Sequence, residues 1–151
     1  MATHQAEVAV RQLVSRKSDE YYTDTEGFGR LASTNFGEKS KSQIRNLENV
    51  ANASMSIADI LDFIKRQTGR SKQWQQEDFG RTLLERIREP LLADAEAIVE
   101  GVKATVEQHG FDADDLRRTH ILLCREFIRH LSAHYSYKIG VSSRRTRRET
   151  K

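Results

Sequence analysis

The sequence contains little cysteine, proline or aromatic residue. One of its 151 residues is cysteine, Cys124, and this excludes an internal disulfide and a cysteine-based zinc module. Proline occurs once, at Pro90, and aromatic residues make up 7% of the chain. A chain with so little proline, and rich in Ala, Leu, Glu, Arg and Gln, favours helix by intrinsic propensity.

Long apolar runs are also missing. No stretch approaches the ~18 apolar residues that a membrane span needs, and the N-terminal residues do not resemble a signal peptide. We therefore expect a cytoplasmic protein with no membrane partner. The mean hydropathy of −0.69 indicates that much of the surface is solvated or contacts a partner.

Positive charge is concentrated at the C-terminal end. The whole chain has a net charge of +3, but its last ten residues contain five basic side chains and one acidic side chain. The remaining residues are therefore close to neutral. An anion-binding site in the body of the protein must come from local clustering of cations.

Apolar residues recur at helical spacing, and no strand pattern appears. We expect helices over about 3–17, 41–53, 56–69, 73–88, 90–108 and 112–137. The predicted fold is an all-α, single-domain bundle of five or six helices spanning 1–140, with a long C-terminal helix. Three glycines and spaced aromatic residues predict a long loop over 18–40, and 141–151 is expected to be a flexible basic tail.

Three arginines of the last predicted helix fall on one side of a helical wheel. At 100° per residue the apolar face contains Ile121, Leu123, Phe127 and other core candidates. Candidate anion-binding residues on the opposite side are Arg118, Arg125 and Arg129. Such a ridge could bind backbone phosphates, which Arg contacts in a bidentate manner. The alternative is a solvated face with intrahelical pairs.

A second group of candidates surrounds the start of the helix predicted at 41–53. Its polar side and the residues just before it combine cations, a hydroxyl and an amide at a helix N-terminus, where unpaired N–H groups favour anions. These candidates are Lys39, Lys41, Ser42, Arg45 and Asn46. Helix capping alone is an equal explanation. A third basic group includes Arg70, but cations stabilise helix C-termini without any ligand.

Catalytic and metal-binding patterns have little support. His130 and His134 are four residues apart, but the glutamate of a zinc-protease helix is missing between them. No nucleophile elbow, phosphate-binding loop or dinucleotide fingerprint is present. We expect no enzymatic activity, no metal and no cofactor.

Two segments resemble the small subunit of type III-A (Csm) CRISPR interference complexes. The first is 41–47, KSQIRNL, which follows Phe36 after a short hydrophilic stretch. The second is 123–140, LCREFIRHLSAHYSYKIG. A weaker match in between consists of Phe63, Gln67, Gly69 and Arg70. The resemblance covers roughly 36–140 in order, and the Arg-rich end after Gly140 lies outside it.

The resemblance implies a helical, non-catalytic subunit of an RNA-guided effector complex. Such subunits stack in several copies along larger backbone and large subunits, and they line the groove that holds guide RNA and target RNA. They contact phosphates without reading bases. Carried over by position, the implied RNA contacts are Lys41, Ser42, Arg45, Arg125 and Arg129.

Two other functions fit the same pattern of helices. A DNA-binding regulator would use a helix–turn–helix within 41–69, although its second helix would begin with the apolar and acidic run Ser56-Ile57-Ala58-Asp59. A protein-interaction adaptor would bind nucleic acid through its basic tail alone.

Overall fold

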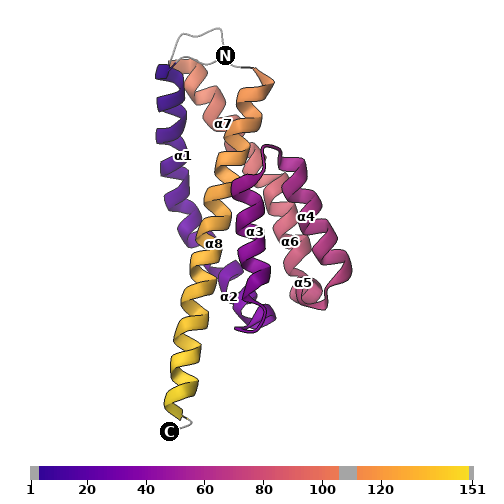
Figure 1. The fold of residues 1–151 in the computed structure, drawn as a ribbon. Helices are drawn as coiled ribbons and strands as arrows, with labels where there is room; N and C mark the ends of the chain where they lie inside the picture. Colours follow the sequence, from indigo (N-terminus) through magenta and orange to yellow (C-terminus); the bar gives the residue numbers. More distant parts are fainter. Residues whose placement is uncertain (1–3, 106–111, 150–151) are drawn as a thin grey trace.

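The protein is a bundle of α-helices built around one long C-terminal helix (Figure 1). The computed structural model describes residues 4–105 and 112–149. Within these residues the elements are α1 (His4–Asp24), α2 (Glu26–Phe36), α3 (Lys41–Ala53), α4 (Ile57–Arg70), α5 (Lys72–Gln75), the 3₁₀ turn η1 (Gln76–Asp78), α6 (Phe79–Arg88), α7 (Pro90–Thr105) and α8 (Ala113–Glu149). No strand occurs in the described ranges, so the predicted all-α bundle with a long C-terminal helix is confirmed.

The central element of the bundle is α8, which packs against α1, α2, α3 and α7. Its N-terminal part lies among these helices, and its C-terminal turns extend past the rest of the molecule (Figure 1). The apolar face predicted from the wheel is confirmed, since Leu123, Phe127 and Leu131 are fully buried. We call 113–131 the inner segment of α8 and 132–149 its outer segment.

Aromatic rings fill the centre of the core. The Trp74 ring contacts the rings of Phe36, Phe63 and Phe79 at centroid distances of 5.5, 6.1 and 5.4 Å, all edge to face. The Trp74 indole N–H donates to Gln43 Oε1 of α3 at 3.0 Å, so its one polar atom is satisfied in the core. These contacts join α2, α3, α4 and α6 into one hydrophobic cluster with α8.

The prediction of a long loop over 18–40 is wrong. Residues 18–24 continue α1, and α2 follows after a break at Thr25, whose hydroxyl donates to the Tyr21 carbonyl oxygen at 2.6 Å. The small residues that suggested a loop are core residues here, because Gly29 and Ala32 let the α2 backbone approach α8 closely. Only the short turn 37–40 remains, with Gly37 at a φ of 58°.

The prediction that the last helix ends at Gly140 is also wrong. α8 continues as a helix to Glu149, so the basic segment 141–149 is helical rather than a flexible tail. One glycine costs only about 1 kcal/mol in a helix. The part of α8 just after Gly140 contacts the 37–40 connection before α3, because Ser143 Oγ donates to Glu38 Oε2 at 2.6 Å.

The other predicted boundaries agree more closely with the structure. Ser56 caps α4 as predicted, accepting the Ala58 N–H at 3.1 Å, and Asp112 Oδ1 accepts the Asp114 N–H at 3.0 Å at the start of α8. The single helix predicted over 73–88 is instead broken at Glu77 and Asp78, which have φ angles of 54° and 55°. The C-terminal end predicted for the helix beginning at Pro90, at 106–110, lies outside the described residues.

Candidate nucleic-acid interface

The ridge of three arginines predicted on α8 is not formed, because Arg125 faces α3. Its Nε donates to the Ala51 carbonyl oxygen and its terminal nitrogen to the Ser54 carbonyl oxygen, both at 3.0 Å. These carbonyls belong to the last turn and the cap of α3, where the helix leaves acceptors unpaired. Arg125 therefore caps α3, and its half-buried side chain connects α3 to the inner segment of α8.

The other two predicted ridge residues are paired with carboxylates of their own helix. Arg118 contacts Asp115 Oδ1 at 2.9 Å, and Arg129 contacts Glu126 Oε2 at 2.5 Å. Burial opposes ionisation of Glu126, but hydrogen bonds from Arg129 and Ser18 hold the pKa of this carboxyl below its ordinary value. The charges of both arginines are thus largely neutralised within α8.

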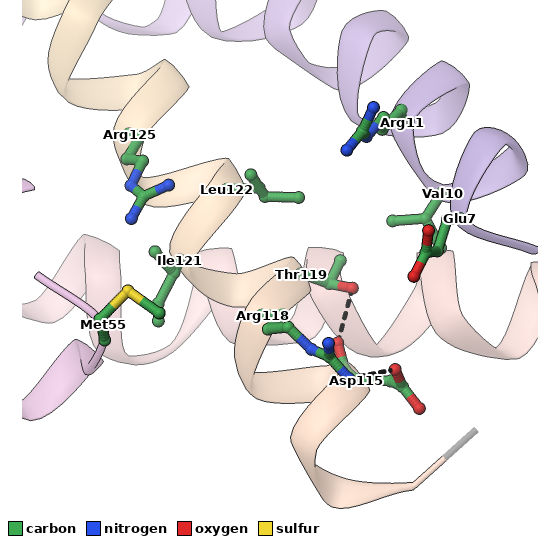
Figure 2. A pocket seen from close by; sticks show the side chains of 10 residues that line it. All are labelled: Glu7, Val10, Arg11, Met55, Asp115, Arg118, Thr119, Ile121, Leu122 and Arg125. Carbon is green, nitrogen blue, oxygen red and sulfur yellow. Dashed lines mark hydrogen bonds and ion pairs between the residues drawn. The ribbon is translucent and has the colours of Figure 1, made fainter. Parts of the chain in front are cut away.

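Arg118 and Arg125 border a hollow between α1, the α3–α4 connection and α8 (Figure 2). Its volume is about 310 Å³. The Val10 and Leu122 side chains face each other across it, and Met55, 85% exposed, closes one side. Arg11 lines this hollow as well, but Glu7 and Asp115 oppose its arginines. Apolar side chains form much of the remaining wall, and this disfavours a phosphate there.

A different surface brings unpaired cations together. This surface, the α3–α8 groove, lies between α3 and the outer segment of α8 and has a volume of about 470 Å³. Lys41, Arg45 and Arg144 line it, and all three are exposed. None of the three forms an ion pair within the part of the chain that the structure describes.

Two carboxylates also line the groove, and serines of α8 hold both. Glu38 accepts the Ser143 hydroxyl at 2.6 Å, and Glu48 accepts the Ser132 hydroxyl at 3.4 Å. Three cations against two carboxylates leave the groove net positive. The rest of its lining is hydroxyl and apolar: Ile44, Tyr135, Ser136, Ile139 and Gly140.

The remaining predicted residues of the α3 group lie close to this groove. Ser42 and Asn46 are exposed on α3, and Lys39 is exposed in the turn before it. The Ser40 hydroxyl does not cap α3 but accepts from Gln73 Nε2 at 2.9 Å. The predicted cluster at the start of α3 is therefore brought together, with Lys41 and Arg45 as its groove-lining members.

Arg70 is separated from this cluster. It is exposed at the C-terminal end of α4, and α4 packs mainly on α3, α5 and α6 rather than on α8 (Figure 1). Lys65, Arg66 and Lys72 are exposed nearby in the sequence. Cations at this helix end have the ordinary stabilising role expected there.

Arg144 is a groove residue that the sequence-based prediction missed. The sequence-based prediction places it in a flexible tail, because Gly140 indicates the end of a helix. The available signal was the series Ser132, Ser136, Ile139 and Ser143, which continues one helical face across Gly140. A single glycine is too weak a signal to end a helix whose face is occupied on both sides of it.

Titratable and nucleophilic side chains in and beside the core are buried or hydrogen-bonded within the fold. Burial raises the pKa of the Cys124 thiol to about 12. His120 is buried and its Nε2 lies 2.8 Å from the Ile87 carbonyl oxygen. Ser18 Oγ lies 2.8 Å from His130 Nε2, but the carboxylate of Glu126 bonds the serine rather than the imidazole, unlike a catalytic triad.

Neither a metal centre nor a membrane span is found among the described residues. No group of three or more His, Cys, Asp or Glu side chains in 4–105 and 112–149 is arranged to hold a metal ion. Among the described helices, none combines the length and the apolar character that crossing a bilayer requires.

Comparison with known proteins gives no relative: no family model, no curated protein and no solved structure matches this chain.

Proposed function

We propose that this protein is a non-catalytic subunit of a ribonucleoprotein, and that it binds RNA backbone in the α3–α8 groove. The observation that carries this proposal is the convergence of Lys41, Arg45 and Arg144 on one groove without an ion pair among the described residues. Cations that are not neutralised by their own fold are available to phosphates, and Arg can bind a phosphate through two parallel N–H donors.

The groove suits a backbone rather than a base sequence. Its polar lining consists of three cations, two carboxylates, and the hydroxyls of Tyr135 and three serines, two of which are already engaged with Glu38 and Glu48. Among the described residues, no Asn or Gln, the side chains that read adenine edges, lines it. Phosphate contacts of this kind position a nucleic acid without carrying sequence information.

The finer proposal is a small subunit of a type III-A CRISPR effector complex, holding guide and target RNA beside larger subunits and further copies of itself. Its support is that the two segments carrying the resemblance form the two walls of the groove. Lys41, Ile44 and Arg45 come from the segment 41–47, and Ser132, Tyr135 and Ser136 from 123–140. Arg125 and Arg129, implied as RNA contacts by the same resemblance, have intramolecular partners instead.

The test is RNA binding as a function of salt concentration. We expect Lys41→Ala with Arg45→Ala to weaken binding of all RNA sequences alike and to reduce the slope of log K against log salt by about 1–2. The matched control is Arg16→Ala with Arg88→Ala, which removes from α1 and α6 two exposed cations that have no ion pair among the described residues. The control should leave the slope unchanged; equal losses in both variants would mean that only net charge matters.

A shortened chain distinguishes the groove from the basic C-terminal end. A protein ending at Arg144 keeps all three groove cations and loses Arg145, Arg147, Arg148 and Lys151. If the groove is the site, this protein retains salt-dependent RNA binding. Complete loss of RNA binding would favour an adaptor that binds nucleic acid only through its basic C-terminal segment. A preference for one duplex DNA sequence would favour a DNA-binding regulator.

A further inference from the structure

A second exposed feature lies on α8 beside the groove. Tyr137 is 69% exposed and Val141, one turn further, is 46% exposed. They share one side of the outer segment, which extends past the other helices (Figure 1). Tyr137 is the most exposed aromatic side chain among the residues that the structure describes.

The charged residues that follow Tyr137 on α8 are positive as far as Arg144. Lys138 follows it directly, and Arg144 lies on the same side of α8, seven residues or about 10 Å further along the axis. Both cations are exposed, and neither has an ion pair within the described residues. Arg144 also lines the α3–α8 groove, so a single path runs from the groove to the Tyr137 ring.

The other strongly exposed tyrosine has the opposite surroundings. Tyr22 of α1 is 54% exposed, but Asp19 and Glu26 lie one turn away on either side of it and are exposed carboxylates. Its ring also packs edge to face on His130 at 5.8 Å and in a tilted arrangement on His134 at 4.9 Å, so it already has partners in the fold. A phosphate chain is therefore repelled at Tyr22 and attracted at Tyr137.

We propose that Tyr137 is a stacking platform for an unpaired base of single-stranded RNA, whose backbone is held by Lys138 and Arg144. Proteins that bind single strands combine a basic groove with exposed aromatic rings on which bases stack, whatever the base. A base within a duplex has no free face to offer. This inference rests on the proposed RNA-binding function and adds a preference for unpaired strands to it.

The experiment compares an RNA single strand of about 12 nucleotides, within the usual range of site sizes, with the corresponding RNA duplex. We expect Tyr137→Leu to weaken single-strand binding by about 5- to 100-fold and to leave duplex binding unchanged. Tyr137→Trp keeps the aromatic face and should bind the single strand about as tightly as the natural protein. Thermal melts of each variant show that the fold is intact.

Tyr22→Leu is the matched control, because it removes an exposed tyrosine at the acidic position. It should leave single-strand binding unchanged. The stacking proposal is overturned if Tyr137→Leu binds the single strand as tightly as the natural protein does, or if its affinities for the single strand and the duplex fall by the same factor. It is also overturned if the substitution affects only association between copies of the protein.

The two proposals fail in different ways. If Lys41→Ala with Arg45→Ala has no effect on either RNA while Tyr137→Leu weakens the single strand, the groove is wrong and the stacking platform stands. If the groove variant weakens both RNAs and Tyr137→Leu weakens neither, the groove stands and the platform is wrong. A natural protein that binds neither RNA overturns both.

Discussion

The inner and outer segments of α8 use their cations in different ways. In the inner segment, Arg125 caps α3, and Arg118 and Arg129 pair with neighbouring carboxylates. In the outer segment, Lys138 and Arg144 are exposed and have no ion pair among the described residues. One helix thus combines arginines that hold the fold together with cations that remain available to a ligand.

The comparison shows that an arginine count along a helix does not locate an anion site. A guanidinium that bonds helix-end carbonyls contributes to stability. A guanidinium beside a carboxylate keeps its charge, but the carboxylate repels a phosphate, so the pair attracts a phosphate less strongly than a lone cation does. What distinguishes the outer segment is that α8 there extends past its neighbours, so that the fold offers its cations fewer partners (Figure 1).

The largest expected effect concerns the contact that positions the outer segment. Gly29 of α2 lies against α8, and a Cβ there would collide with His134 Cβ and come within 3.1 Å of the Tyr135 backbone nitrogen. We expect Gly29→Ala to destabilise the protein by about 3 kcal/mol, since backbone cannot move aside as a side chain can. Urea unfolding measures this change.

Gly27→Ala, two residues away on the same helix, is the control. A Cβ at Gly27 meets nothing within 4 Å. The substitution should be neutral or stabilise α2 by up to about 1 kcal/mol. If both variants were equally stable, α2 would not hold the outer segment as described.

The second prediction sharpens the contrast at Arg125. Arg125→Ala leaves the Ala51 and Ser54 carbonyls without their donor, so we expect a loss of about 2 kcal/mol in the free energy of unfolding. RNA affinity of the folded fraction should not change. Arg45→Ala should weaken RNA binding and leave the free energy of unfolding unchanged, because Arg45 is exposed and has no ion pair in the described ranges. A stable Arg125→Ala protein with weakened RNA binding would contradict the assignment.

The smallest expected effect is a pH dependence of the inner segment. Burial lowers the pKa of His120 below its ordinary value, despite the hydrogen bond to the Ile87 carbonyl oxygen. The unfolded chain, with an ordinary histidine pKa of about 6.5, then binds more protons than the folded protein below that pH. Stability should therefore be lost as the pH falls below about 6.5, and should level off below the folded pKa of His120.

His120→Gln keeps an N–H donor for the Ile87 carbonyl oxygen but cannot titrate. Urea unfolding of the variant and the natural protein at about pH 7.5 and about pH 5.5 measures the difference. The variant should lose less stability on acidification. The residual pH dependence includes His130, whose pKa is also lowered by burial and by the neighbouring Arg129 charge. An unchanged pH dependence in His120→Gln would show that His120 is not buried as a neutral imidazole.

Helical periodicity predicted the fold class and the core face of α8, because burial of Leu123, Phe127 and Leu131 requires only a 3.6-residue repeat. It failed at 18–40, where core positions at the α1–α2 junction and along α2 are occupied by Thr25, Gly29 and Ala32. Small residues give no hydrophobic signal, yet they are what a close helix crossing needs. Composition alone could not distinguish such a crossing from a loop.

The candidate site was predicted in part, for a related reason. Lys41 and Arg45 were found because they begin a helix whose polar side is clear in the sequence. The sequence-based prediction placed Arg125 on an exposed ridge, but Arg125 contacts α3. A helical wheel gives the direction of a side chain around its own helix, but it does not show which neighbouring helix packs on that side. The partners of Arg118 and Arg129 were visible in the sequence, as carboxylates three residues earlier.

The most direct test of this account compares two pairs of exposed cations in one RNA-binding measurement. Lys41→Ala with Arg45→Ala removes groove cations, and Arg118→Ala with Arg129→Ala removes cations paired within α8. We predict that the slope of log K against log salt falls by about 1–2 for the groove pair and stays unchanged for the α8 pair. A reduced slope for the α8 pair, with an unchanged slope for the groove pair, would contradict the account.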